Sequence, residues 1–244
     1  MPTTFLHLTR ALAPADLLSL RRDPFLVWMI LLPAAVALFL RVAMAPLAAW
    51  LARATGFDLW TLTPVIMSSY LALAPLLVGL VTGFLLLDAR DEGSLAALRT
   101  TPVRPADYLL YRLSLPLGLG LVVTLVCYPI VGLLPLPLGA LLAVALLAAF
   151  AAPLMALALA GFAANKVAGL ALFKGLNVLV MLPIAAYFLP MPWQLAAGII
   201  PLYWPLKVLW LATAGQPYAW AWVIGLAVNG VAAWLLLRRF GAER

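Results

Sequence analysis

Long uninterrupted apolar segments constrain this chain more than any other feature of its sequence. A helix needs about 20 predominantly apolar residues to cross a bilayer. Segments that approach or exceed this length occur at 24–46, 63–87, 111–134, 138–164, 176–191 and 217–237. Only helices and closed barrels satisfy their backbone in lipid, and barrel strands would alternate polar with apolar residues. The sequence therefore predicts an all-α membrane protein with six transmembrane helices in a single domain, 1–244.

The positions of the basic residues predict the orientation of these helices. With a cytoplasmic N-terminus, twelve of the fifteen Lys and Arg residues fall on the cytoplasmic side, and Arg41, Arg53 and Lys207 fall outside. This asymmetry follows the positive-inside rule and places both termini in the cytoplasm, at the plasma (bacterial inner) membrane. The net charge of +7 thus encodes orientation. Basic residues do not cluster on one face, so we expect lipid and no nucleic acid as a partner.

The N-terminal segment 1–23 mixes apolar and polar side chains. This pattern predicts an amphipathic helix in the membrane interface, with a solvated terminus as the alternative. Arg21-Arg22, an apolar run and Ala43-Met44-Ala45 also outline a signal peptide. Because the run is long enough to span and five more spans follow, we expect a retained anchor.

The segment 191–216 is apolar enough to be a seventh span, but Pro201 and Pro205 interrupt it. A seventh crossing would also move Arg238 and Arg239 outside, against the charge rule. We therefore expect a broken re-entrant hairpin on the outer side, with its two pieces at 193–200 and 205–213.

A polar segment, 88–110, separates the second span from the third. Asp91 and Glu92 suit the N-terminus of a short helix, Arg99 suits its C-terminus, and Pro102 would stop it. Leu95 and Leu98 then share one face of that helix. Such a helix is suited to docking into a groove on a soluble partner; an ordinary solvated loop is the alternative.

The stretch 87–108 resembles the cytoplasmic signature of ABC-2 type transporter permeases, in which an acidic pair precedes Gly-Ser, a short helix and a Thr-Pro turn. The six-span layout is also similar, and Pro-Leu-Tyr-Trp-Pro at 201–205 is most similar to drug-export permeases, including fluoroquinolone exporters. The resemblance implies a coupling helix seated in a cleft of an ATP-hydrolysing subunit. The implied contact residues are Asp91, Glu92, Gly93, Leu95, Leu98, Arg99, Thr101 and Pro102. This sequence departs from the family at Ala96, where an acidic residue is common, so one ion pair with the ATPase is in doubt.

A second coupling contact is expected at 165–175, with Asn165 and Lys166. The chain has no Gly-x4-Gly-Lys-Ser/Thr motif with which to hold nucleotide phosphates. It therefore needs no cofactor of its own, and ATP and Mg²⁺ would be bound by a separate ABC ATPase subunit. Six spans would form half of a pathway, completed by a second copy or a related permease in a homo- or heterodimer.

Other function classes lack the residues that they need. No Asp or Glu lies in the core of a span, which argues against an ion-coupled carrier. The only histidine, His7, lies outside the spans, so an intramembrane protease or a multi-His metal site is not expected. The spacing of Asp88, Asp91 and Asp107 does not suit a metal-dependent transferase. We expect a protein that is not an enzyme, with no catalytic residue and no metal.

Polar side chains within the spans either line a pathway or join helices, and the second interpretation is favoured. They are Ser68, Ser69, Tyr70, Thr82, Thr124, Tyr128, Asn177 and Asn229. The substrate-binding residues thus stay unassigned, and the lone Cys127 is expected to serve only in packing. The sequence favours the permease subunit of an ATP-driven exporter of drugs or other amphipathic molecules. The alternative is a non-transporting membrane scaffold that recruits a cytosolic partner through 88–110.

Overall fold

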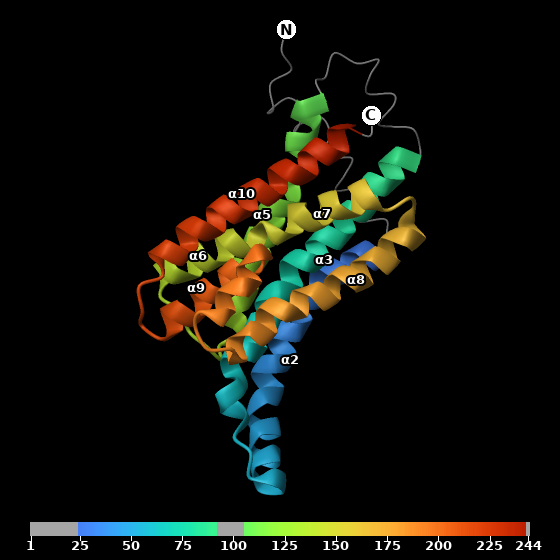
Figure 1. The fold of residues 1–244 in the computed structure, drawn as a ribbon. Coiled ribbons are helices and arrows are strands. Elements are labelled where there is room, and N and C mark those ends of the chain that lie inside the picture. The colour runs from blue at the N-terminus through green and yellow to red at the C-terminus, as the bar shows by residue number, and fades with distance from the viewer. Residues whose placement is uncertain (1–23, 92–104, 243–244) are drawn as a thin grey trace.

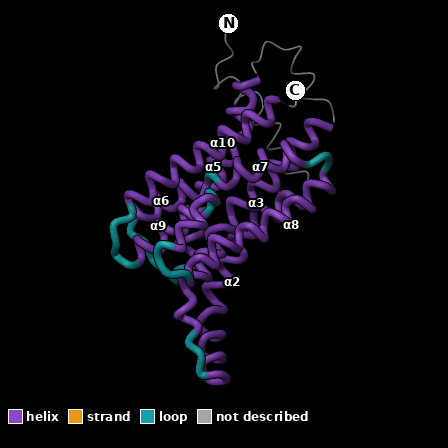
Figure 2. The backbone as a smooth tube through the Cα atoms, in the orientation of Figure 1, coloured by secondary structure: helices purple, strands orange, loops and turns teal. Residues whose placement is uncertain are grey.

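The computed structural model describes residues 24–91 and 105–242, and within these ranges every element is a helix (Figures 1 and 2). The predicted interfacial helix at 1–23 and residues 92–104 of the predicted coupling segment lie outside the described residues. The elements are α2 (Pro24–Thr55), η1 (Leu59–Leu62), α3 (Thr63–Asp91), α5 (Pro105–Val131), α6 (Leu138–Ala149), α7 (Ala151–Phe162), α8 (Lys166–Ala185), η3 (Ala186–Phe188), η4 (Trp193–Ile199), α9 (Tyr203–Thr213) and α10 (Ala219–Ala242).

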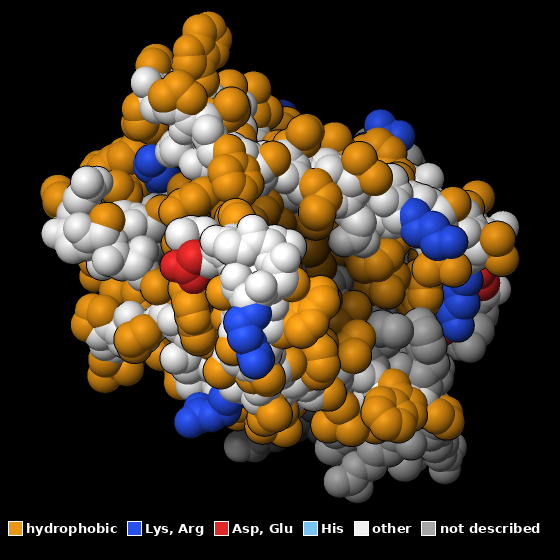
Figure 3. Space-filling model, turned by 90° about the horizontal axis from the view of Figure 1, so that it is seen from below, with side chains coloured by type: hydrophobic (Ala, Val, Ile, Leu, Met, Phe, Trp, Pro, Cys, Tyr) orange, Lys and Arg blue, Asp and Glu red, His pale blue; other side chains and the backbone are white. Residues whose placement is uncertain are grey.

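Six helical stretches in the described part of the chain are long and apolar enough to cross a membrane, as the sequence predicts. They are Leu31–Thr55, Leu59–Asp91, Tyr111–Val131, Leu138–Phe162, Lys166–Phe188 and Ala219–Arg239. Their outward surfaces carry many large apolar side chains. Seen from below, the molecule likewise shows mostly apolar groups, with a few separate basic and acidic ones (Figure 3). A protein with this surface is suited to contact with hydrocarbon.

Two boundaries differ from the sequence prediction. The fifth span begins at Lys166 rather than near 176, because Asn165 caps the helix there, so Lys174 lies within α8 and not in a loop. The first helix continues to Thr55, and residues 47–55, predicted as an external loop, are helical. Arg41 lies within this helix and donates a hydrogen bond to Ile130 O (2.9 Å) near the end of α5. Figure 1 shows the C-terminal half of α2 projecting beyond the other helices.

The centre of the bundle is the pair formed by α3 and α7. Gly79 and Gly83 form a Gly-x-x-x-Gly pattern on α3, and both lie against α7 with almost no free space. A Cβ atom added at Gly79 would come within 2.6 Å of Ala152 O, and one at Gly83 within 2.7 Å of Leu159 Cδ1. Small residues let membrane helices approach closely, so that backbone and side chains pack without lipid between them. The spacing of Gly79 and Gly83 is visible in the sequence, but no helix contact was predicted from it.

The fourth span bends at Phe150, between α6 and α7. Pro153 lies in the first turn of α7 and has no N–H to donate to the carbonyl four residues earlier. Phe150 N instead bonds to Leu147 O (3.3 Å), and Leu154 N bonds to Phe150 O (3.2 Å). A proline bend thus separates the α6 half of the span, which packs on α9, from the α7 half, which packs on α3.

The segment 191–216 folds into two pieces, η4 and α9, as the sequence predicts, although α9 begins at Tyr203 rather than at 205. Residues 203–211 are buried, and α9 packs against α6 and α10. Trp210 Nε1 donates to Ser68 Oγ on α3 (2.8 Å), and Trp204 Nε1 donates to Gly198 O (2.9 Å). We call residues 186–216 the hairpin. Its insertion into the membrane as a re-entrant element stays a prediction.

Candidate functional site

The polar segment after the second span is joined directly to the turn before α8. Lys166 Nζ lies 2.8 Å from Asp88 Oδ1, and both side chains are partly exposed. Asp88 is in the last turn of α3, and Lys166 is the first residue of α8. This ion pair therefore brings together the two segments that the sequence predicts as separate coupling contacts.

Arg90 makes the stronger connection. Its guanidinium donates hydrogen bonds to Ala160 O (3.3 Å), Ala163 O (2.8 Å) and Ala164 O (2.7 Å). The last carbonyls of a helix have no partner within the helix, and a cation there also interacts favourably with the helix dipole. Arg90 therefore fixes the end of α3 to the end of α7. We call Asp88, Arg90 and Lys166, with the carbonyls that Arg90 contacts, the polar clamp.

Asn165 caps the N-terminus of α8. Its backbone is extended (φ −160°, ψ 178°), and its side-chain oxygen accepts a hydrogen bond from Ala168 N at 2.9 Å. This is the geometry of a helix N-cap, for which asparagine is among the preferred residues. Asn165 remains exposed, but its amide oxygen is used to begin α8.

Of the predicted coupling residues, only Asp91 belongs to the part of the chain that the structure describes. Asp91 is described and exposed, and its carboxylate lies 3.9 Å from Arg90 Nε. The other predicted contact residues lie outside the described residues: Glu92, Gly93, Leu95, Leu98, Arg99, Thr101 and Pro102. Their contact with an ATPase stays a prediction, but the helices that flank them, α3 and α5, pack against each other.

The polar groups within the spans bond to backbone carbonyls of the chain itself. Ser68, for example, donates to Pro64 O (2.7 Å), and Tyr70 donates across helices to Pro33 O (3.0 Å). The same holds for Ser69, Thr82, Thr124, Tyr128, Asn177 and Asn229. Each of these groups therefore has a backbone partner, while their absence from a transport pathway stays a prediction. Within the described ranges no three His, Cys, Asp or Glu side chains gather as metal ligands.

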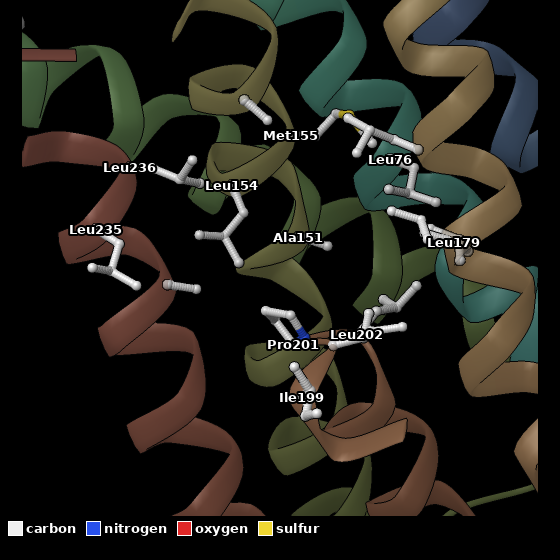
Figure 4. A pocket seen from close by; sticks show the side chains of 15 residues that line it. Leu76, Ala151, Leu154, Met155, Leu179, Ile199, Pro201, Leu202, Leu235 and Leu236 are labelled. Carbon is white, nitrogen blue, oxygen red and sulfur yellow. The ribbon is translucent and has the colours of Figure 1, made fainter. Parts of the chain in front are cut away.

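An apolar groove of about 410 Å³ lies between α8 and α10, with α7 between them (Figure 4). Leu154 and Met155 come from α7, Leu179 from α8 and Leu235 from α10, and the corner between η4 and α9 contributes Ile199 and its neighbours up to Leu202. No polar side chain is among the lining residues. The groove is therefore suited to hydrocarbon or to the apolar part of an amphipathic molecule.

The six apolar helices define the class of this chain, which is a multi-pass α-helical membrane protein. The model of the fluoroquinolones export permease protein Rv2686c-like family matches residues 16–237. Two relatives from Mycobacterium tuberculosis are the fluoroquinolones export permease proteins MT2760 (strain CDC 1551 / Oshkosh) and Rv2686c (strain ATCC 25618 / H37Rv). Each is 32% identical over 232 residues, which cover 93% of this chain and 92% of the relative. The chain belongs to the Rv2686c-like family of export permeases, as the resemblance implied. No solved structure matches it.

Proposed function

We propose that this permease is the membrane-spanning subunit of an ATP-binding cassette exporter that moves fluoroquinolone-like drugs or other amphipathic small molecules. A separate ATPase subunit would bind ATP and Mg²⁺, and a second permease, identical or related, would complete the pathway. The orientation proposed from the basic residues puts both termini and the polar clamp in the cytoplasm of a bacterial inner membrane. Membership in a family of export permeases supports this proposal.

The observation that carries the proposal is the polar clamp. A segment that receives a push from an ATPase must be attached firmly to the helices that it moves. Arg90 and the Asp88–Lys166 pair attach the beginning of the coupling segment to α7 and α8. Through the clamp, motion of 91–100 would reach two helices at once rather than α3 alone.

The same two helices line the apolar groove. Leu154 belongs to α7 and Leu179 to α8, so a displacement of these helices at the clamp would change the shape of the groove. In the proposed mechanism, closure of the two ATPases pushes on the coupling helix, and the clamp passes this motion to α7 and α8. In this mechanism the residues of the coupling helix and of the polar clamp transmit motion, and ATP hydrolysis takes place on the ATPase subunit.

Substitution of Leu98 tests the docking of the ATPase. The chain is co-expressed with its genomic neighbours and purified in detergent, and co-purifying ATP hydrolysis is measured. We expect Leu98→Asp to reach the membrane normally but to lose the ATPase, because a carboxylate in an apolar cleft pays for desolvation. Leu98→Met, which keeps an apolar side chain of similar volume, should retain it.

Two results would contradict the proposal. Retention of the ATPase by Leu98→Asp would show that docking does not use this face. A wild-type chain that purifies without any ATPase, with all neighbours present, would favour the scaffold alternative over an ATP-driven exporter.

A further inference from the structure

Lys207 on α9 is the only charged side chain among the described residues that is buried, with 6% of its surface exposed. Its ammonium contacts Gln194 Oε1 at 2.7 Å and Met191 Sδ at 3.6 Å. Both partners are neutral, and a thioether is a weak acceptor. No described Asp or Glu lies within ion-pair distance of Lys207. A cation removed from water in this way is costly unless an anion joins it.

A second polar group beside Lys207 is also without a partner. Tyr203 is completely buried, and its hydroxyl makes no hydrogen bond in the described structure. Residues four apart on a helix share one face, so Tyr203 and Lys207 are neighbours along α9. Both lie beneath η4: Lys207 contacts Gln194, and the ring of Tyr203 lies close to Gly198. The hairpin thus holds two donors on one helix face, one charged and one unsatisfied.

We propose that this face of α9, with Lys207 and Tyr203 as donors, binds the carboxylate group of an amphipathic organic acid. The carboxylate would replace the amide oxygen of Gln194 as the acceptor for the ammonium. An ionised acceptor makes a shorter and stronger hydrogen bond than a neutral one, so this exchange is favourable. Tyr203 would donate to the second carboxylate oxygen. A fluoroquinolone carries such a carboxylate, so the inference deepens the proposed export function and rests on it for the choice of probe.

Entry to this face requires movement of η4, not of the transmembrane bundle. η4 is a seven-residue 3₁₀ helix, and Gly198 is its only buried residue. The hydrogen bonds that join η4 to side chains of α9 in the described structure are the Lys207–Gln194 bond and the bond from Trp204 to Gly198 O. The apolar groove is bounded by the same corner, at Ile199–Leu202. An amphipathic acid that reaches the groove therefore meets the segment that covers Lys207.

A comparison of a carboxylic acid with its methyl ester distinguishes binding at Lys207 from nonspecific apolar binding, because the ester lacks the carboxylate charge. The purified permease, in nanodiscs of zwitterionic lipid and without an ATPase, is dialysed to equilibrium against a fluoroquinolone or its methyl ester. We expect Lys207→Met to weaken binding of the acid about tenfold or more, the usual scale for a lost charge-assisted hydrogen bond. Binding of the ester should change less than about twofold. Tyr203→Phe should weaken binding of the acid alone, by about threefold to tenfold.

Lys207→Arg keeps the positive charge and should bind the acid better than Lys207→Met does. This recovery would show that the loss in Lys207→Met comes from the missing charge and not from a folding defect. Lys174→Met, at an exposed lysine of α8, is the matched control and should bind both compounds as the wild type does. The proposal is overturned if Lys207→Met binds the acid normally, or loses acid and ester equally. It is also overturned if anionic lipid alone displaces the acid, since the site would then serve a phosphate headgroup. Failure of the ATPase to co-purify leaves this binding test intact, so the two proposals fail separately.

Discussion

At the scale of single residues, the basic side chains differ in how far they are exposed and in which groups they contact. Arg90 and Lys166 lie near the surface and make contacts that hold helices together, whereas Lys207 is buried among neutral groups. Burial lowers the pKa of Lys207 from its ordinary value of 10.5, because the ammonium loses hydration. Burial also raises the pKa of Tyr203, its neighbour on α9, to about 12. Lys207 therefore titrates below 10.5, at pH values where the Tyr203 hydroxyl keeps its proton.

Stability should depend on pH through Lys207 in a predictable direction. A lowered pKa means that the unfolded chain binds the proton more tightly than the folded one, so the stability of the fold rises with pH between the lowered value and 10.5. Below that window the full penalty of a buried charge is present, and above it the penalty is absent. We expect the thermal midpoint of the wild type in detergent to rise from pH 7 to 10 relative to Lys207→Met. A difference that stays constant with pH would mean that the charge of Lys207 is compensated in the folded protein.

At the scale of elements, the helices differ in how they are packed although their compositions are alike. α3 and the α6–α7 span are mostly buried within the protein, whereas α2, α8 and α10 expose most of their apolar surface. Hydrophobicity cannot distinguish these two groups, because lipid is as apolar as a protein core. Small residues mark the central contact: Gly79 and Gly83 of α3 lie against Ala152 and Leu159, and α7 packs more extensively on α3 than on α10 or α8.

Gly79→Ala tests the contact between α3 and α7. Its Cβ would lie 2.6 Å from Ala152 O and 2.7 Å from Met155 Cβ, distances at which the helices must move apart. We expect a loss of about 1–3 kcal/mol in stability, measured by unfolding in mixed detergent micelles. Gly118→Ala, on α5 with nothing within 4 Å, is the matched control and should be neutral or slightly stabilising. Equal effects of the two substitutions would show that helix propensity, and not packing, governs both sites.

At the scale of the whole molecule, the chain has two different ends. The polar clamp belongs to one end, where α3 and α7 finish and α8 begins. The hairpin belongs to the opposite end, between the finish of α8 and the start of α10. Among the acidic residues within 24–91 and 105–242, only Asp58 lies in a connection at that second end. The proposed docking site of the ATPase and the proposed carboxylate site thus lie at opposite ends of the helix bundle.

The orientation of these ends can be measured with single cysteines, since Cys127 is the only native one. In a Cys127→Ala background, Gln216→Cys and Ala164→Cys place a thiol in exposed turns at opposite ends. We expect a membrane-impermeant maleimide to label Gln216→Cys in intact cells and Ala164→Cys only after permeabilisation, because basic residues favour the cytoplasmic side. The reverse pattern would place both termini outside and would remove the polar clamp from the reach of a cytoplasmic ATPase.

The number of spans, the helical class and the two-piece hairpin could be predicted from the sequence, because length, hydropathy and proline positions act locally along the chain. The family could be predicted from the motif at 87–108. The start of the fifth span was misplaced, since Asn165, Lys166 and Lys174 suggested a polar connection, whereas Asn165 caps α8 and both lysines lie within that helix. Three features became visible only in the folded protein: which spans are central, where the groove lies, and the contact of Arg90 with the end of α7, 70 to 74 residues away in the sequence. In a uniformly apolar chain, helix partners are selected by close fit and by a few long-range hydrogen bonds. The Gly-x-x-x-Gly spacing of Gly79 and Gly83 marks one surface of such a contact in the sequence, but neither the partner helix nor the hydrogen bonds can be read from it.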